Sequence, residues 1–148
     1  MTLWPPTMGL RPTRIATWRS SLALLQYISA GTGIAHSEHN RSDETIRLLQ
    51  VWIVPDRRGH EPAYGEYRFL WEERENRLLH MVSGFDGSAP VKINQDANLY
   101  SLSLDQARAL EMAIGPGRQG YLVQIEILAS ERSHFLLVEM KKGGPAPS

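Results

Sequence analysis

Short apolar stretches separated by turns rich in proline and glycine recur along most of this chain. The clearest are residues 46–54 (IRLLQVWIV), 121–128 (YLVQIEIL) and 134–140 (HFLLVEM), which are rich in the branched and aromatic residues that strands favour. Further candidate strands are residues 22–29, 64–71, 77–82, 91–93 and 99–104. Roughly seven to nine short strands, with a turn about every 8–12 residues, predict an all-β sandwich or barrel.

Three segments do not follow this pattern. Residues 1–25 begin with a stretch that prolines interrupt and that shows no periodicity, so we expect an irregular leader there. Residues 105–114 (DQARALEMAI) have a composition that favours helix, yet part of the segment alternates as a strand does, so both structures stay open. The tail at residues 143–148 is polar and rich in proline and glycine, and we expect it to be disordered.

Composition excludes several classes of function. The 16 basic and 16 acidic residues cancel, so no overall field attracts nucleic acid or an anionic membrane surface. The chain has no cysteine, which excludes disulfides and thiolate ligands and fits a cytoplasmic protein. Any metal site must then use His, Asp, Glu, Asn or Gln. No apolar run approaches the ~18 residues of a membrane span. The acid-poor, arginine-bearing start is also compatible with a transit peptide, the less favoured interpretation.

Residues 29–40 (SAGTGIAHSEHN) contain the densest group of chemically active side chains. In an extended segment His36 and Glu38 project to the same side, with their Cα atoms ~7 Å apart, so one metal ion can lie between them. Gly31 and Gly33 let the backbone bend just before this pair, because glycine takes positive φ angles freely. The alternative is an ordinary surface loop that happens to contain both residues.

The letters around this pair resemble a known family. Gly33, His36 and Asn40 fit the second cupin motif, G-x-x-H-x-x-x-N, and the longer run QYISAGTGIAHSEHN resembles the metal-site segment of pirins. Pirins are the bicupin family that includes quercetin 2,3-dioxygenases. The similarity continues through residues 48–69 (LLQVWIVPDRRGHEPAYGEYRF) and 86–100 (DGSAPVKINQDANLY). The resemblance implies an all-β, cupin-type β-barrel, a partial bicupin of jelly-roll character.

The resemblance also implies how the chain is divided. It begins abruptly near Gln26, which indicates a pirin shortened at its N-terminus, and its second cupin is shortened as well. It favours extended structure over helix for residues 105–114. The expected organisation is an irregular leader at 1–25, a partial N-terminal cupin at 26–82, a shortened C-terminal cupin at 83–142 and a disordered tail at 143–148.

The metal ligands that the resemblance implies are only partly found in this sequence. Pirins bind one metal, usually iron, through three histidines and one glutamate. The H-S-E step of the family maps onto His36 and Glu38, and the resemblance makes Glu38 the group that takes the 3-hydroxyl proton of a flavonol. The family's upstream H-x-H step is not found here, since His36 is the first histidine. We therefore expect Fe(II), with Mn, Ni, Co or Cu as alternatives, to be weakly bound or absent.

Other residues are poor replacements for the missing ligands. His39 would face the opposite side of an extended segment from His36. His60 is expected to be a solvated turn residue, and His80 a half-buried strand histidine that holds a hydrogen bond. His134 and Glu139 are expected to mark the edges of the last strand. Aromatic residues could line a flavonoid-sized pocket, but core packing is the favoured interpretation of Trp52, Tyr64, Tyr67, Phe69 and Trp71.

Three functions remain in competition. The first is a quercetin 2,3-dioxygenase that acts on a flavonoid-like small molecule, provided that the metal site is completed. The second is a non-catalytic regulatory pirin with a protein partner, and neutral net charge argues against direct DNA binding. The third is an inactive remnant whose unpaired strand edges lead to a homodimer or to aggregation.

Overall fold

The computed structural model describes residues 13–18, 23–37, 39–40, 43, 45, 48–128 and 132–143. The chain divides into two compact units, which are residues 1–71 with 93–95 and residues 72–92 with 96–148. Within the described residues, no helix is long and apolar enough to cross a membrane. The described elements are almost entirely strands, so the prediction of an all-β protein is confirmed.

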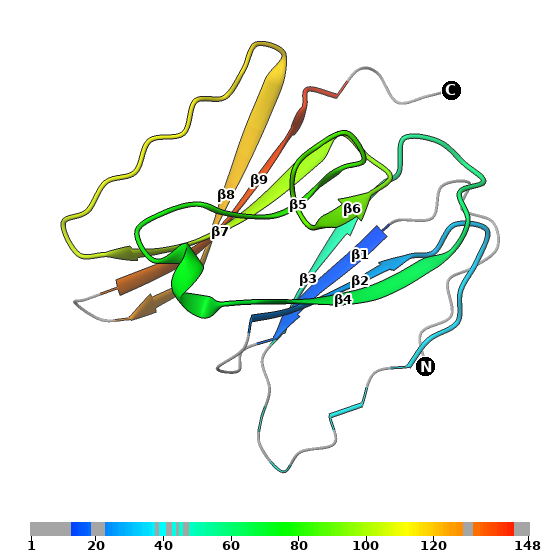
Figure 1. Ribbon diagram of the computed structural model, residues 1–148, viewed down its shortest axis with the longest axis horizontal. Helices are drawn as coiled ribbons and strands as arrows, with labels where there is room; N and C mark the ends of the chain where they lie inside the picture. The colour runs from blue at the N-terminus through cyan, green and yellow to red at the C-terminus, as the bar shows by residue number, and fades with distance from the viewer. Residues whose placement is uncertain are drawn as a thin grey trace. The chain divides into compact units, whose positions relative to one another are not determined.

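The first unit contains a four-stranded antiparallel sheet (Figure 1). Its order is β3-β1-β2-β4. The strands are β1 (Thr13–Trp18), β2 (Ala23–Ser29), β3 (Leu48–Ile53) and β4 (Ala63–Phe69). Predictions of strands over residues 22–29 and 46–54 are confirmed to within two residues at each end. β3 ends just before Pro55, which has no backbone N–H to continue a ladder.

Strand β1 corrects the expectation of an irregular leader over residues 1–25. Residues Thr13–Trp18 pair with β2 on one side and with β3 on the other, so this strand is interior to its sheet. It begins directly after Pro12, the last of the leader's prolines. Six residues carry too little periodicity to show a strand by themselves. The pairing that holds them comes partly from β3, which begins thirty residues after β1 ends.

The aromatic residues of this sheet are less buried than expected. Phe69 is buried, but Trp52, Tyr64 and Tyr67 each expose more than two fifths of their surface, so core packing is the wrong interpretation for these three. Their strands explain the difference. β3 and β4 are the outer strands of the sheet, and their side chains have a neighbouring strand on one side only.

The second unit is a five-stranded sheet in the order β6-β5-β7-β9-β8. A short 3-10 helix, η1 (Trp71–Arg74), precedes it in the chain. Its strands are β5 (Leu79–Gly84), β6 (Val91–Ile93), β7 (Ala97–Asp105), β8 (Arg118–Leu128) and β9 (Arg132–Lys141). All five had been predicted from the sequence. In β7 the alternate residues Leu99, Ser101 and Ser103 are buried, as their shared face predicts.

Residues 106–117 are neither helix nor strand, so the prediction of extended strand over 105–114 is wrong beyond Asp105. Figure 1 shows this segment as a long irregular connection, in yellow, between β7 and β8. A turn ends the strand: the Arg108 N–H donates to the Asp105 carbonyl at 3.2 Å, and Ala107 has a φ of +57°. The Asp105 carboxylate meanwhile accepts hydrogen bonds from the side chains of Asn76 and Arg132, which fixes the point where β7 stops.

Candidate functional site

The loop that leads to His36 bends at two glycines, as the sequence predicts. Gly31 has a φ of +49° and Gly33 a φ of +145°, both in the region that residues with a side chain rarely adopt. The Gly33 N–H closes the bend by donating to the Ala30 carbonyl at 2.7 Å. β2 thus ends at Ser29, and the chain turns before it reaches His36.

Gly31 is required for a second reason besides its backbone angle. A Cβ built on it would overlap the backbone of residues 60–62, above all the carbonyl oxygen of His60. The bend before His36 is therefore packed directly against the segment that follows the PDRRG turn. A side chain at Gly31 would force the two segments apart.

The structure describes only one of the two predicted metal ligands. His36 is partly buried, whereas Glu38 lies outside the described residues. Their convergence on one metal ion stays a prediction. His39, in the described pair of residues 39–40, is exposed to solvent.

Among the described residues, the donors around His36 do not form a complete metal site. In the part of the chain that the structure describes, no group of three or more His, Asp or Glu side chains lies close enough to hold a metal ion. His36 with Glu38 would supply two ligands, and a firm site for a divalent metal uses more. The described residues therefore do not by themselves supply the four-ligand centre that the resemblance implies.

His60 differs from the solvated turn residue that was expected. Its side chain is only 14 % exposed, and its Nε2 lies 2.6 Å from Oδ1 of Asp56, four residues earlier. The hydrogen bond from His60 lowers the pKa of Asp56, and the smaller opposing effect of burial does not cancel it. The contact between the two side chains closes the PDRRG turn, in which Gly59 has a φ of +79°.

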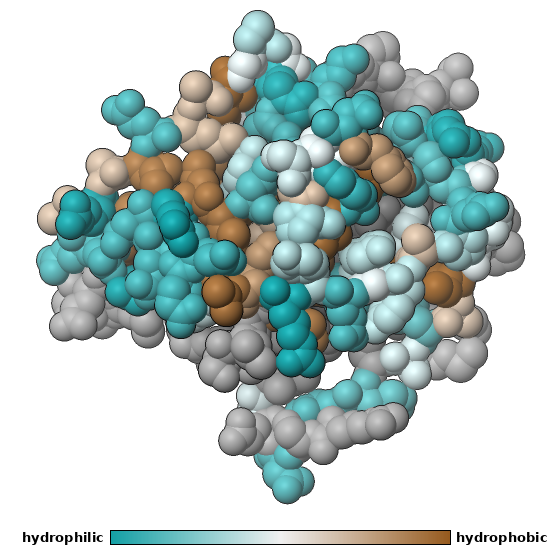
Figure 2. Space-filling model, in the orientation of Figure 1, coloured by the Kyte–Doolittle hydropathy of each residue, from teal (hydrophilic) through white to brown (hydrophobic). Residues whose placement is uncertain are grey.

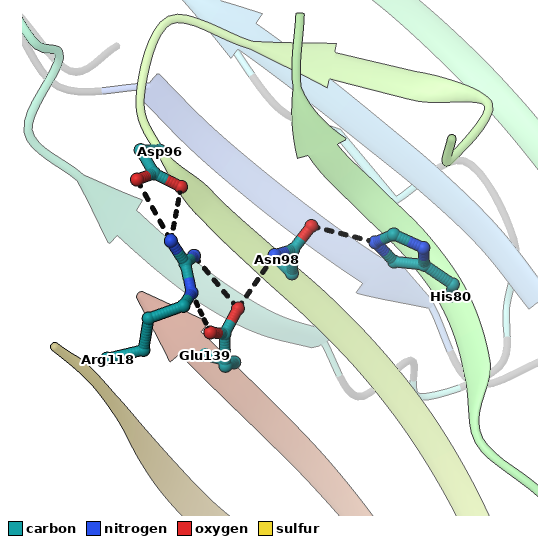
Figure 3. Close-up of polar contacts among 5 residues, drawn as sticks. All are labelled: His80, Asp96, Asn98, Arg118 and Glu139. Atoms are coloured by element: carbon teal, nitrogen blue, oxygen red, sulfur yellow. Dashed lines mark hydrogen bonds and ion pairs between the residues drawn. The ribbon is translucent and has the colours of Figure 1, made fainter. Parts of the chain in front are cut away.

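The second unit holds a chain of polar side chains that crosses four strands (Figure 3). His80 Nε2 lies 2.9 Å from Asn98 Oδ1, and Asn98 Nδ2 donates to Glu139 Oε2 at 2.7 Å. Arg118 donates to both oxygens of Glu139 and, through its third nitrogen, to both oxygens of Asp96 at 2.8 and 2.9 Å. We call these five residues the polar relay.

The geometry of the polar relay assigns its protons. Asn98 Oδ1 can only accept, so the His80 Nε2 must carry the hydrogen, and its Nδ1 then accepts from Ser88 Oγ at 3.4 Å. The His80 ring also stacks on Tyr100, with ring centroids 4.4 Å apart. The prediction of a half-buried strand histidine that holds a hydrogen bond is confirmed.

Glu139 lies near the end of β9, where the sequence predicts it, but its burial was not predicted. It is only 4 % exposed, because β9 lies between β7 and β8. The hydrogen bonds from Arg118 lower the pKa of Glu139, and the same contact raises the pKa of Arg118. Burial, with a smaller contribution from the charge of Glu139, raises the pKa of Tyr100. Because its groups are mutually paired, the polar relay fixes the strands and offers no open ligand position.

Comparison with known proteins identifies relatives of both halves of the chain. The family profile described as the quercetinase C-terminal cupin domain matches residues 80–127. A Pseudomonas aeruginosa protein named as a candidate quercetin 2,3-dioxygenase is 41 % identical over 106 residues, which are 71 % of this chain and 46 % of that protein. The quercetin 2,3-dioxygenase of Escherichia coli is 41 % identical over 80 residues, which are 53 % of this chain and 33 % of that protein.

A solved structure shares the fold. The bacterial pirin YhhW of Escherichia coli, crystallised with nickel(II), matches with a TM-score of 0.73 at 23 % identity and covers 89 % of this chain and 73 % of its own. This match supports the prediction of a cupin-type β-barrel fold. The chain spans less than half the length of these curated relatives.

Proposed function

The chain belongs to the pirin family of cupin proteins, and from that premise we propose that it is a weak metal-binding cupin in which His36 and Glu38 hold a divalent ion. The observation that carries the proposal is the bend at Gly31 and Gly33, where positive φ angles turn the chain just before His36. Fe(II) is the proposed metal, with Mn, Ni, Co or Cu as alternatives. The nickel(II) complex of the bacterial pirin supports a metal of this class.

Weak binding follows from the number of ligands. Two protein ligands leave most positions of a divalent ion to water, and each missing ligand also removes the contacts that would orient its neighbours. The 148 residues contain no H-x-H step, and no other cluster of three ligands occurs among the described side chains. When bound, such a metal polarises an oxygen ligand. We propose that this chain retains the binding of the metal without efficient turnover.

The test compares the protein with two histidine variants. Purified protein is loaded anaerobically with Fe(II), passed through a desalting column and analysed for metal by mass spectrometry, beside His36→Ala and His39→Ala. His39 is the matched control because it is an exposed histidine in the same loop. We expect partial metal content in the parent and in His39→Ala, and its loss in His36→Ala. Equal metal content in all three proteins would show that His36 is not a ligand.

The second candidate function is flavonol 2,3-dioxygenation, which the names of the relatives favour. In this proposal Glu38 takes the proton of the 3-hydroxyl group, which requires its carboxylate within hydrogen-bond reach of that oxygen. Loss of quercetin absorbance in air is measured for the same three proteins. We expect no metal-dependent turnover. Turnover that His36→Ala abolishes and His39→Ala keeps would replace the weak-binding proposal with a working enzyme, its site completed by further ligands.

A non-catalytic role stays open beside these two. Regulatory pirins act through a protein partner, and such a role does not need a complete metal site. A cytoplasmic location, the lack of direct binding to nucleic acid and the lack of a membrane partner all stay predictions from composition.

A further inference from the structure

A small hollow in the first unit has a lining that suits an anion. It lies where the end of β2 meets the PDRRG turn, and it is small and open to solvent. The polar lining comes from Ser29, Arg57, Arg58 and His60, and glycine backbone from Gly31 and Gly59. None of the lining residues is acidic.

The charge of the hollow is only partly offset by a nearby carboxylate, since Asp56 interacts with the charge of Arg57. Asp56, the acid within the turn, is held by His60 at 2.6 Å. Neither Arg57 nor Arg58 forms an ion pair with any carboxylate that the structure describes. Both arginines line the hollow and are exposed, and a guanidinium group can offer paired N–H donors to a planar or tetrahedral oxyanion.

A buried hydroxyl supplies a third donor from the wall of the hollow. Ser29 is only 6 % exposed, and its Oγ accepts a hydrogen bond from Asn94 Nδ2 at 3.1 Å. Asn94 thereby occupies an acceptor position of this oxygen, and the hydroxyl proton of Ser29 remains available to donate. A buried hydroxyl that lines a positively charged hollow gains most from an acceptor, since a buried donor without one is costly.

Gly59 leaves the backbone of the hollow accessible, whereas Gly31 is closely packed. Gly31 cannot carry a side chain, because a Cβ would meet the backbone at residues 60–62. Gly59 has a φ of +79° and no atom within 4 Å of the position that a Cβ would take. A ligand can therefore approach the main chain at Gly59 without displacing a side chain.

We propose that this hollow is a binding site for a small oxyanion, a carboxylate or phosphate group held by Arg57, Arg58 and Ser29. None of the lining residues is one of the proposed metal ligands, and the site needs no metal. Carboxylate and phosphate present the same acceptor chemistry to arginine, so the proposal names that shared group.

The experiment follows the amide signals of the isotopically labelled full chain by NMR during titrations with inorganic phosphate and, separately, with acetate. Sodium chloride holds the ionic strength constant. We expect saturable shifts of the Gly31 and Gly59 amides with at least one of the two anions, and the anion that binds identifies the source. The absence of saturable shifts of these amides with both phosphate and acetate would overturn the proposal.

Charge-matched variants separate a specific site from general attraction. Arg57→Gln with Arg58→Gln should weaken the binding about tenfold or more, because both charge-assisted contacts are lost. Arg108→Gln with Lys142→Gln removes the same charge from exposed positions in the other unit and should change the binding less than about twofold. Equal weakening in both double variants would overturn the proposal.

Two alternative substitutions at Gly59 repeat the test without removing an arginine. Gly59→Asp places a carboxylate at the open edge of the hollow, and Gly59→Asn is its neutral match, since both residues tolerate positive φ better than most. We expect Gly59→Asp to abolish the shifts and Gly59→Asn to keep them. His36→Ala should leave the anion titration unchanged, so failure of the metal proposal and failure of this one are distinguishable.

Discussion

At the scale of single residues, Glu139 carries the largest energetic consequence. A carboxylate that is 4 % exposed is tolerated only if its charge is paired and its oxygens are hydrogen-bonded. Arg118 supplies the paired charge, and Asn98 supplies a further donor. Arg118 also donates to Asp96, which directly precedes β7. The loss of the Glu139 carboxylate therefore disturbs contacts that join β8 and β9 to the start of β7.

We predict that Glu139→Gln destabilises the protein by about 2 kcal/mol at pH 7, because Arg118 loses its buried counter-charge. Since the folded state lowers the pKa of Glu139, its contribution is fully present above the unfolded value of about 4.3 and is lost as pH falls through the lower folded value. The difference in the free energy of unfolding between the parent protein and the variant should therefore become smaller below about pH 4. Urea unfolding at pH 7 and at progressively lower pH measures both free energies.

Glu111→Gln is the control for this prediction, because Glu111 is exposed in the irregular segment between β7 and β8. We expect a change within about 0.5 kcal/mol at every pH. If the difference in the free energy of unfolding between the parent protein and Glu139→Gln stays constant through the acid range, the assignment of a lowered pKa to Glu139 is contradicted.

At the scale of elements, residues 106–117 show what a strand needs besides composition. Their letters alternate well enough to suggest a strand, but Ala107 takes a positive φ and the side chains of Asn76 and Arg132 end β7 at Asp105. No ladder then holds the following residues, and most of them are exposed. A segment with few backbone hydrogen bonds opens more readily than the strands beside it.

We predict that trypsin cleaves after Arg108 before it cleaves after Arg118 or Arg132. The last two arginines lie within β8 and β9, where the backbone must leave its ladder to enter a protease. Limited digestion at low enzyme concentration, followed by mass spectrometry of the fragments over time, measures the order. Replacing Arg108 with Gln should remove the early fragment, and early cleavage after Arg118 would show that β8 is less firmly paired than the sheet indicates.

At the scale of the whole molecule, neutral charge and an open sheet edge act together. The formal net charge at pH 7 is zero, so charge repulsion between copies is minimal near that pH. β8 is the last strand of its sheet, and its consecutive residues Tyr121, Leu122 and Val123 are exposed by 53 %, 63 % and 45 %. Figure 2 shows apolar residues gathered over the part of the second unit that holds β8 and residues 106–117. Such an edge is a template for pairing with another strand.

We predict self-association through β8 that increases with concentration near pH 7 and weakens at pH 9, where the net charge is negative. Leu122→Lys should reduce it, because a charge on an edge strand opposes pairing. Leu70→Lys is the matched control, since Leu70 is also 63 % exposed but follows β4. Size-exclusion chromatography with light scattering measures the mass. A single mass at all concentrations, or equal effects of the two variants, would rule out this edge as the contact.

Local features of the amino-acid sequence were sufficient for much of the fold. Branched and aromatic residues between turns predicted the strands from β2 onward, and the glycines at 31 and 33 predicted the bend before His36. The run around His36 indicated the family. These inferences succeed because side-chain alternation and the φ preference of glycine depend on a residue and its immediate neighbours.

Only the tertiary structure decided the rest, because it depends on residues far apart in the chain. β1 is a strand because β3 pairs with it, and Glu139 is buried because β9 lies between β7 and β8. The hollow beside Ser29 forms where β2 meets a turn more than twenty residues later. Pairing register and the convergence of side chains from different strands leave no periodic trace in the local sequence, so folding alone brings these groups together.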